Sequence, residues 1–134
     1  MKAGLVVDTH AVLWYLADDP ALSVRAAAAL DAITIAGGPI YVPAICLVEA
    51  IYLAEKGRIP GMALERLLFA LEEPNARFVL APLDWIVAMA VRGIARADVP
   101  DLPDRVIAAT AAALRLPLVT KDGRIRATNQ ETLW

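Results

Sequence analysis

Short runs of apolar residues alternate with longer segments of helical periodicity along this chain. The strand-like runs are residues 3–7, 40–42, 77–80 and 118–120, and the helical segments are residues 9–17, 23–33, 44–56, 62–72, 83–91 and 103–115. Strands that alternate with helices usually form a parallel sheet, because each crossover helix returns the chain to the same edge of the sheet. We therefore expect an α/β fold of three layers, with helices on both faces of a mainly parallel sheet. Residues 132–134 are a candidate for a short closing strand.

The composition favours one soluble domain. The chain has 134 residues, of which 59% are apolar, and this is enough for a single domain over residues 1–134 with a sizeable core. The longest uncharged run, Ala32–Val48, contains Gly37 and Pro43, so it does not predict a membrane-spanning helix. Cys46 is the only cysteine, and the sequence does not open with the basic segment and the following apolar segment of a signal peptide. Both observations indicate a cytoplasmic protein.

Four carboxylates stand within or directly after apolar stretches: Asp8, Glu49, Asp104 and Asp122. An ionised carboxylate among apolar side chains is costly unless a cation or hydrogen-bond donors compensate its charge. Asp8 and Asp122 also follow strands, and binding sites of parallel sheets form at those strand ends. Because ligands that are all oxygen favour hard ions, the pattern predicts a site for Mg²⁺ or Mn²⁺.

Three of these acids also have a structural explanation, which the sequence leaves open. Asp8 can cap the helix that follows it, and Asp104 can belong to a capping box with Asp101. Asp122 stands before a glycine, which is a common turn dipeptide. Each acid alone is therefore weak support for a metal site.

Glu49 differs because the helical segment around it, residues 44–56, is apolar on every side. Pro43 suits the start of this helix and Gly57 its end. A helix that is hydrophobic all round is normally buried, so we expect this one to lie in the core. Glu49 is then either a metal ligand or half of a buried ion pair with an arginine such as Arg105.

Other candidate residues favour packing or solvation. His10 and Trp14 lie in an apolar helical pattern, and Cys46 has no neighbour that would lower the pKa of its thiol, so all three are interpreted as packing or surface residues. The local basic cluster is Lys121, Arg124 and Arg126. It is either a solvated face or a contact for backbone phosphates of a nucleic acid.

The four acids stand in the segments DTHAVLWYL at Asp8, VPAICLVEAIYLAEKGRI at Glu49, DLPDRVIAATA at Asp104 and LVTKDGRI at Asp122. In this order the segments resemble the PIN domain, and in particular the VapC toxins of bacterial and archaeal toxin–antitoxin pairs. The resemblance extends over essentially the whole chain. It depends on the combination of the four segments, because each alone is a common pattern.

The resemblance implies a three-layer α/β/α PIN-like domain and a magnesium- or manganese-dependent endoribonuclease. The family's catalytic and metal-binding acids are matched by Asp8, Glu49, Asp104 and Asp122, and its accessory acid by Asp101. Small polar positions that line the pocket are matched by Thr9 and Thr120. Beside them we expect Lys121 and Arg124 to contact RNA. The predicted reaction is hydrolysis by a metal-activated water, which leaves a 5′ phosphate and a 3′ hydroxyl.

The resemblance also implies partners. We expect an RNA substrate, a homodimer and a cognate VapB-type antitoxin that covers the site with its C-terminal segment. Contact with DNA is expected only through the antitoxin, and no contact with membranes is expected. The alternative is a PIN-like binding module without catalysis. A phosphorylated receiver or phosphatase domain is disfavoured, because His10 stands where such a phosphatase has a second Asp.

Two positions depart from the family pattern. Pro43 and Cys46 stand where the family often has Ser, and Val48 where it often has Trp. A hydroxyl that would hold a water or orient Glu49 is therefore missing. We expect lower activity or a changed metal preference, while all the acids are retained.

Overall fold

The computed structural model describes residues 4–75 and 77–134 of the chain, and a five-stranded sheet runs through them. Ala3, where the first strand was expected to begin, lies outside the described residues. The strands are β1 (Leu5–Val7), β2 (Ile40–Pro43), β3 (Phe78–Ala81), β4 (Leu118–Val119) and β5 (Thr132–Leu133). Their order is β3-β2-β1-β4-β5 and every neighbouring pair is parallel. The expected parallel sheet and its closing strand are confirmed.

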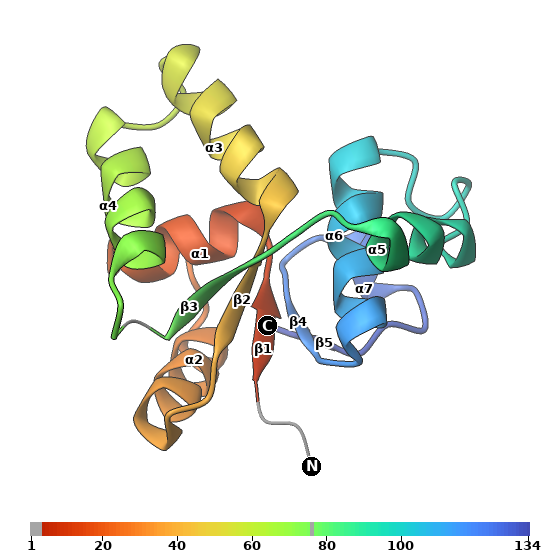
Figure 1. Cartoon of the computed structure of the whole chain (residues 1–134), viewed down its shortest axis with the longest axis horizontal. Coiled ribbons are helices and arrows are strands. Elements are labelled where there is room, and N and C mark those ends of the chain that lie inside the picture. The colour runs from red at the N-terminus through yellow and green to blue at the C-terminus, as the bar shows by residue number, and fades with distance from the viewer. Residues whose placement is uncertain (1–3, 76) are drawn as a thin grey trace.

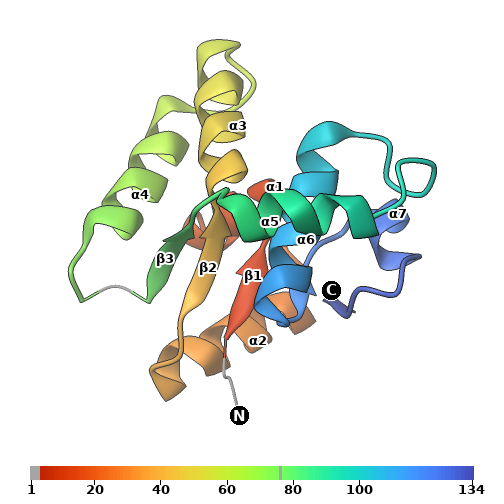
Figure 2. The same cartoon turned by 45° about the vertical axis from the view of Figure 1, so that its right-hand side comes forward.

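Helices cover both faces of this sheet. They are α1 (Thr9–Leu16), α2 (Val24–Ala36), α3 (Ala44–Glu55), α4 (Gly61–Glu72), α5 (Trp85–Ala90), α6 (Leu102–Leu114) and α7 (Gly123–Arg126), with a 3-10 turn, η1 (Val91–Gly93), after α5. Connections through α1–α4 step along the sheet in one direction, and those through α5–α7 step in the other. Because parallel crossovers are right-handed, the two groups lie on opposite faces, as Figures 1 and 2 show. The three-layer α/β/α architecture is therefore confirmed.

The core lies on both sides of the central strand. Val6 and Val7 of β1 are fully buried, as are Leu30 of α2 and Leu118 of β4, and Ile107 of α6 is almost fully so. Strands covered on both faces carry apolar residues at consecutive positions rather than at alternate ones. This explains why the strand segments are continuous apolar runs in the sequence.

Side-chain caps set several helix boundaries. Ser23 accepts a hydrogen bond from the backbone N–H of Ala26 at the start of α2, as its sequence position predicts. Asp84 accepts one from the N–H of Val87, so α5 begins at residue 85 instead of the predicted 83. Leu83 consequently lies outside the helix and is exposed.

The prediction that α3 is buried on all sides is wrong. Only Cys46 and Ala50 of this helix are buried, whereas the side chains of Val48 and Tyr52 are 49% and 58% exposed. One side of α3 faces α1, α4, α6 and β2, and nothing in the described part of the chain covers the other side. A sequence cannot distinguish burial within the chain from an apolar face left open to solvent.

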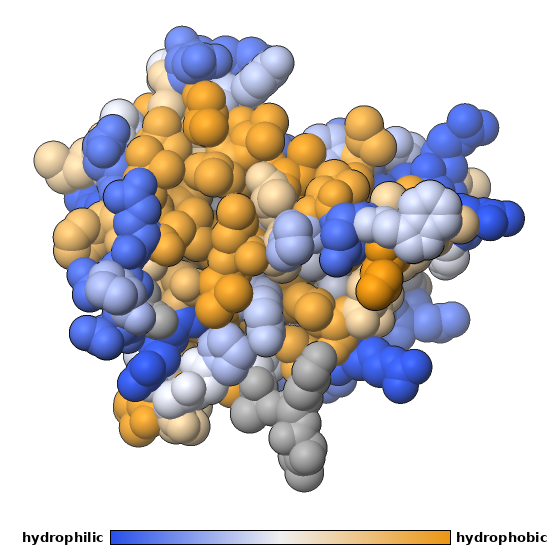
Figure 3. Space-filling model, in the orientation of Figure 1, coloured by the Kyte–Doolittle hydropathy of each residue, from blue (hydrophilic) through white to orange (hydrophobic). Residues whose placement is uncertain are grey.

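An exposed apolar surface extends from α3 over α4 and β3. Its residues are Val48, Ile51, Tyr52, Met62, Phe69, Val79 and Leu80. Figure 3 shows apolar side chains gathered over these elements. We call this set the α3–α4–β3 surface. Separately, no helix among residues 4–75 and 77–134 has the length and apolar character needed to cross a bilayer.

Candidate active site

The central strands β1 and β4 end beside each other, and the chain leaves them through helices on opposite faces of the sheet. Asp8 directly follows β1, while Thr120 and Asp122 follow β4. In open parallel sheets, ligands bind outside the carboxyl ends of the strands where the crossover direction reverses. The fold therefore places two of the four acids at its most probable binding site.

Asp8 is held by two hydrogen bonds, one on each carboxylate oxygen. Oδ1 accepts from the backbone N–H of Ala11, 2.9 Å away, and so caps α1. Oδ2 accepts from the Thr120 hydroxyl at 2.5 Å. Burial raises the pKa of Asp8 above its usual range, and these two bonds lower it in part. Capping and a site role are therefore compatible, because each oxygen can still accept further contacts.

Thr120 joins Asp8 to Asp122. Its hydroxyl is fully buried, donates to Asp8 and accepts a hydrogen bond from the N–H of Asp122 at 3.0 Å. Asp122 does not form the simple turn that the sequence predicted. Its Oδ1 accepts from the N–H groups of Arg124 and Ile125 at 2.9 and 3.0 Å, and so caps the short helix α7.

The pKa of Asp104 lies far above the usual range of a carboxyl group. Burial, followed by the charges of Asp101, Asp122 and Glu49, raises its pKa to about 7. Asp101 caps α6, and its Oδ2 accepts from the N–H of Asp104 at 3.1 Å. Four acids thus lie close enough together for their charges to oppose the ionisation of Asp104.

One cavity of about 250 Å³ brings three of the predicted acids together. Its lining residues are Asp8, His10, Trp14, Asp104, Lys121 and Asp122. We call it the Asp8 cavity. Lys121 therefore lies where the sequence placed it, whereas Arg124 is exposed on α7 and does not line the cavity. Thr9 and Thr120 are buried and hydrogen-bonded to the acids, so they position carboxylates and do not line the open space.

Glu49 stands beside this cavity, not in its wall. Its Oε1 accepts a hydrogen bond of 2.6 Å from the Thr9 hydroxyl, and Thr9 directly follows Asp8. The alternative interpretation, an ion pair between Glu49 and Arg105, is wrong. The Arg105 guanidinium donates to the backbone carbonyls of Val91 and Ile94 at 2.7 to 3.0 Å, and so holds η1 against α6.

The donor set fits a hard divalent cation in its chemistry. The cavity offers carboxylate oxygens, and burial together with the charges of neighbouring acids raises the pKa of Asp104. Within residues 4–75 and 77–134, however, no three His, Cys, Asp or Glu side chains are already grouped closely enough to hold a metal ion. A metal ion at this site would therefore need the carboxylates to turn toward it.

His10 and Trp14 were interpreted from the sequence as packing or surface residues, but both line the Asp8 cavity. They stand four residues apart on α1, which places them on the same face of the helix. This spacing of four residues was the feature of the sequence that could have placed both side chains at the site, although it is also typical of core packing. The core interpretation of Cys46 is confirmed, because the side chain is fully buried and burial raises the pKa of its thiol.

Comparisons with known proteins identify similar sequences and folds. The family model described as the PIN domain matches residues 5–131. The chain is similar to FitAcB from Neisseria gonorrhoeae, with 25% identity, a TM-score of 0.63 and coverage of 96% of this chain and 95% of that one. It is also similar to DNA-bound VapBC from Salmonella typhimurium (21%, TM-score 0.67, coverage 98% and 97%) and to VapBC2 from Rickettsia felis bound to a promoter fragment (16%, TM-score 0.69, coverage 97% of each). No curated protein sequence matches significantly.

Proposed function

Because the chain belongs to the PIN domain family, we propose that it is a magnesium- or manganese-dependent endoribonuclease and the toxin of a toxin–antitoxin pair. One observation carries the proposal. Asp8, Asp104 and Asp122 come from three separate places in the sequence and line one cavity at the reversal point of a parallel sheet. The raised pKa of Asp104 supports it, because an excess of negative charge in a cavity is what a divalent cation offsets.

In the proposed reaction Asp8, Asp104 and Asp122 hold the cation, and Glu49 and Asp101 complete or orient the set. A bound divalent ion would neutralise charge on the phosphate and acidify a water. Thr120 would keep the Asp8 carboxylate in place, and its hydrogen bond lowers the pKa that burial raises. The hydrogen bond from the Thr9 hydroxyl would orient Glu49. Lys121, in the cavity wall, is placed to attract a backbone phosphate.

Cleavage of a mixed cellular RNA pool tests the activity. The purified chain, freed of antitoxin, should produce discrete cuts with Mg²⁺ or Mn²⁺ and none with a chelator. Since water attacks and not the ribose 2′ hydroxyl, the products should end in a 5′ phosphate and a 3′ hydroxyl. Products with 2′,3′-cyclic phosphate ends would contradict this mechanism.

Replacing Thr120 by Val should slow cleavage about 10- to 100-fold, the usual cost of losing a residue that orients a metal ligand. Valine has nearly the same shape, so the variant removes the hydroxyl that holds Asp8 and Asp122 without opening a cavity. Thr110→Val is the matched control. Thr110 is equally buried, but its hydroxyl donates only to the carbonyl of Val106 within α6.

Initial cleavage rates of both variants, at equal folded fraction by circular dichroism, check this prediction. Equal rates for Thr120→Val and Thr110→Val would show that the hydroxyl does not position Asp8.

The proposed partner is a VapB-type antitoxin, and the α3–α4–β3 surface supports it. Large exposed apolar patches usually mark an interaction site. Beside this surface, between α4 and the end of α1, a cavity of about 630 Å³ is lined by Leu16, Met62 and Phe69 together with Glu65 and Arg66. A solved toxin–antitoxin complex from Klebsiella pneumoniae contains a similar fold, with 20% identity and a TM-score of 0.66. A homodimer belongs to the proposal as well, and sedimentation velocity of the isolated chain tests it.

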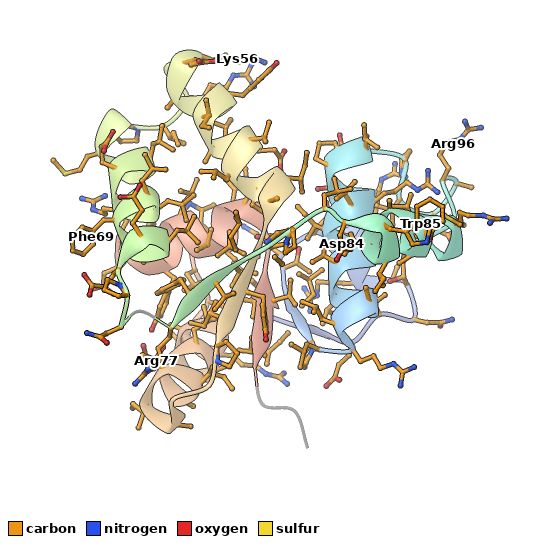
Figure 4. All side chains as sticks on the ribbon, in the orientation of Figure 1. Lys56, Phe69, Arg77, Asp84, Trp85 and Arg96 are labelled. Carbon is orange, nitrogen blue, oxygen red and sulfur yellow. The ribbon has the colours of Figure 1, made fainter. Side chains whose placement is uncertain are left out.

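Replacing Phe69 by Glu should weaken the antitoxin complex by at least about tenfold, because a charge would replace an anchor in an apolar contact. Phe69 is 70% exposed and projects away from α4 at one side of the molecule (Figure 4), so the chain itself loses little packing. Val24→Glu is the control, since Val24 is 89% exposed on α2, outside this surface. Titration calorimetry with the co-encoded antitoxin measures both; equal affinities would exclude this surface.

A further inference from the structure

We propose that His10 and Trp14 form a stacking platform that holds an unpaired nucleobase of the RNA beside the cleaved phosphate. This inference rests on the proposed ribonuclease function and deepens it. It assigns a substrate-positioning role to two residues that hold no metal and carry no proton in the proposed reaction.

The platform lies in the wall of the Asp8 cavity. The same cavity of about 250 Å³ is lined by acids from strand and helix ends and by the two aromatic residues of α1. A phosphate held at the acids would therefore have its own or a neighbouring base within reach of α1. Lys121, in the same wall, is positioned to contact the connecting backbone.

The rings are ordered and partly open to solvent. The centroids of His10 and Trp14 are 5.4 Å apart at 46°, and those of Trp14 and Trp134 are 6.0 Å apart at 60°. Trp134 thus supports Trp14 from one side, while His10 is exposed and Trp14 only half-buried. A ring held in this way loses little conformational freedom when a base stacks on it.

The charge of the cavity favours this mode of recognition. Three carboxylates and one lysine line it, so electrostatic attraction of the RNA there is limited to the bound cation and Lys121. Stacking does not depend on charge, and each base stacked on an aromatic side chain typically contributes enough affinity to change binding about 5- to 150-fold. Bases in a duplex are already stacked on each other, so only an unpaired base can use the platform.

The test measures binding, not cleavage, in a protein that cannot cut. In an Asp104→Asn background with Mg²⁺, fluorescence anisotropy gives the affinity for a labelled 12-nucleotide single-stranded RNA. Trp14→Leu should lower this affinity about 5- to 150-fold, and Trp14→Phe should retain most of it. His10→Ala, a change at an exposed residue, should lower it by a smaller factor without loss of folding. Trp85→Leu is the matched control, because Trp85 is 77% exposed on α5 and lies outside the cavity.

A series of the same RNA with one abasic position at a time separates stacking from structural damage. At the stacking position, removal of the base should weaken binding to the parent protein by the same factor as Trp14→Leu, and should not weaken binding to Trp14→Leu any further. The duplex form should bind equally to both.

Unchanged affinity in Trp14→Leu and His10→Ala would overturn the platform, as would a loss that is the same for every abasic position. If the wild-type chain cuts RNA while those results are obtained, only the platform fails. If the parent binds no RNA and the wild type cuts none, the platform fails together with the proposed function.

Discussion

Asp8→Asn and Asp104→Asn should each reduce RNA cleavage by more than about a hundredfold. Loss of a residue that merely orients a metal ligand already costs about 10- to 100-fold, and these two carboxylates are the proposed ligands themselves. Asparagine keeps the shape and one carbonyl oxygen but removes the charge. Asp8→Asn also keeps an acceptor for the N–H of Ala11, so α1 retains its cap.

The variants should remain folded, which makes the loss interpretable. Asp104→Asn removes a carboxyl whose pKa is raised by burial and by three neighbouring acids, so the apo protein should gain stability at pH 8. Asp84→Asn is the matched control, because Asp84 caps α5 (Figure 4) and does not line the Asp8 cavity. Single-turnover rates check the prediction. Full cleavage by Asp8→Asn or Asp104→Asn would locate the activity elsewhere or in a contaminant.

Mn²⁺ at a hundred times its dissociation constant should stabilise the folded protein by about 2.7 kcal/mol at pH 8, a rise of roughly 10 °C in Tm. The same addition at pH 5.5 should stabilise it far less. The pKa of Asp104 is about 7, so at pH 5.5 this carboxyl is mostly protonated, and binding a cation must first release the proton. The effect should grow as the pH rises through 7.

Without metal the pH dependence should have the opposite sign. The pKa of Asp104 is about 7 in the folded protein and 3.8 when unperturbed, so between these values the folded state binds more protons than the unfolded state. Its contribution to the free energy of unfolding therefore falls as the pH rises from about 4 to 7. Asp104→Asn should abolish this fall.

Melting curves of wild type and Asp8→Asn, with and without Mn²⁺ at both pH values, measure these effects. Equal shifts in the two proteins would place the ion outside the Asp8 cavity. No shift in the wild type at pH 8 would favour the alternative that the chain is a binding module without catalysis.

The order of elements could be predicted from the sequence because strand and helix segments differ in periodicity. Residues that favour helix caps and turns also mark where these segments begin and end. Ser23 marks the start of α2 and the acids Asp8 and Asp122 mark strand ends, and each lies where expected. The four-residue helix α7 could not be predicted, because it is too short to show a helical period. Its signal was the capping ability of Asp122, which was interpreted as a turn.

The site itself was only partly readable. Its acids are recognisable in the sequence because they interrupt apolar segments. The residues that donate hydrogen bonds to these acids are not recognisable in the same way. Thr120 is 112 residues from Asp8, and nothing local in the sequence indicates that they are hydrogen-bonded. The exposure of α3 was missed for a related reason, since the pattern that buries a helix in its own chain also suits a helix covered by another molecule.

The hydrogen bond between Thr120 and Asp8 also determines when the proposed site can first form during synthesis. Translation delivers Asp8 early, yet the Oδ2 atom of its carboxylate has no Thr120 hydroxyl to accept from until β4 has been made and has docked beside β1. A nascent chain that ends before β4 carries two of the acids that line the cavity but lacks Thr120, Asp122 and Lys121. The proposed toxin activity would thus be withheld from any nascent product that ends before β4, because docking of this two-residue strand completes the site.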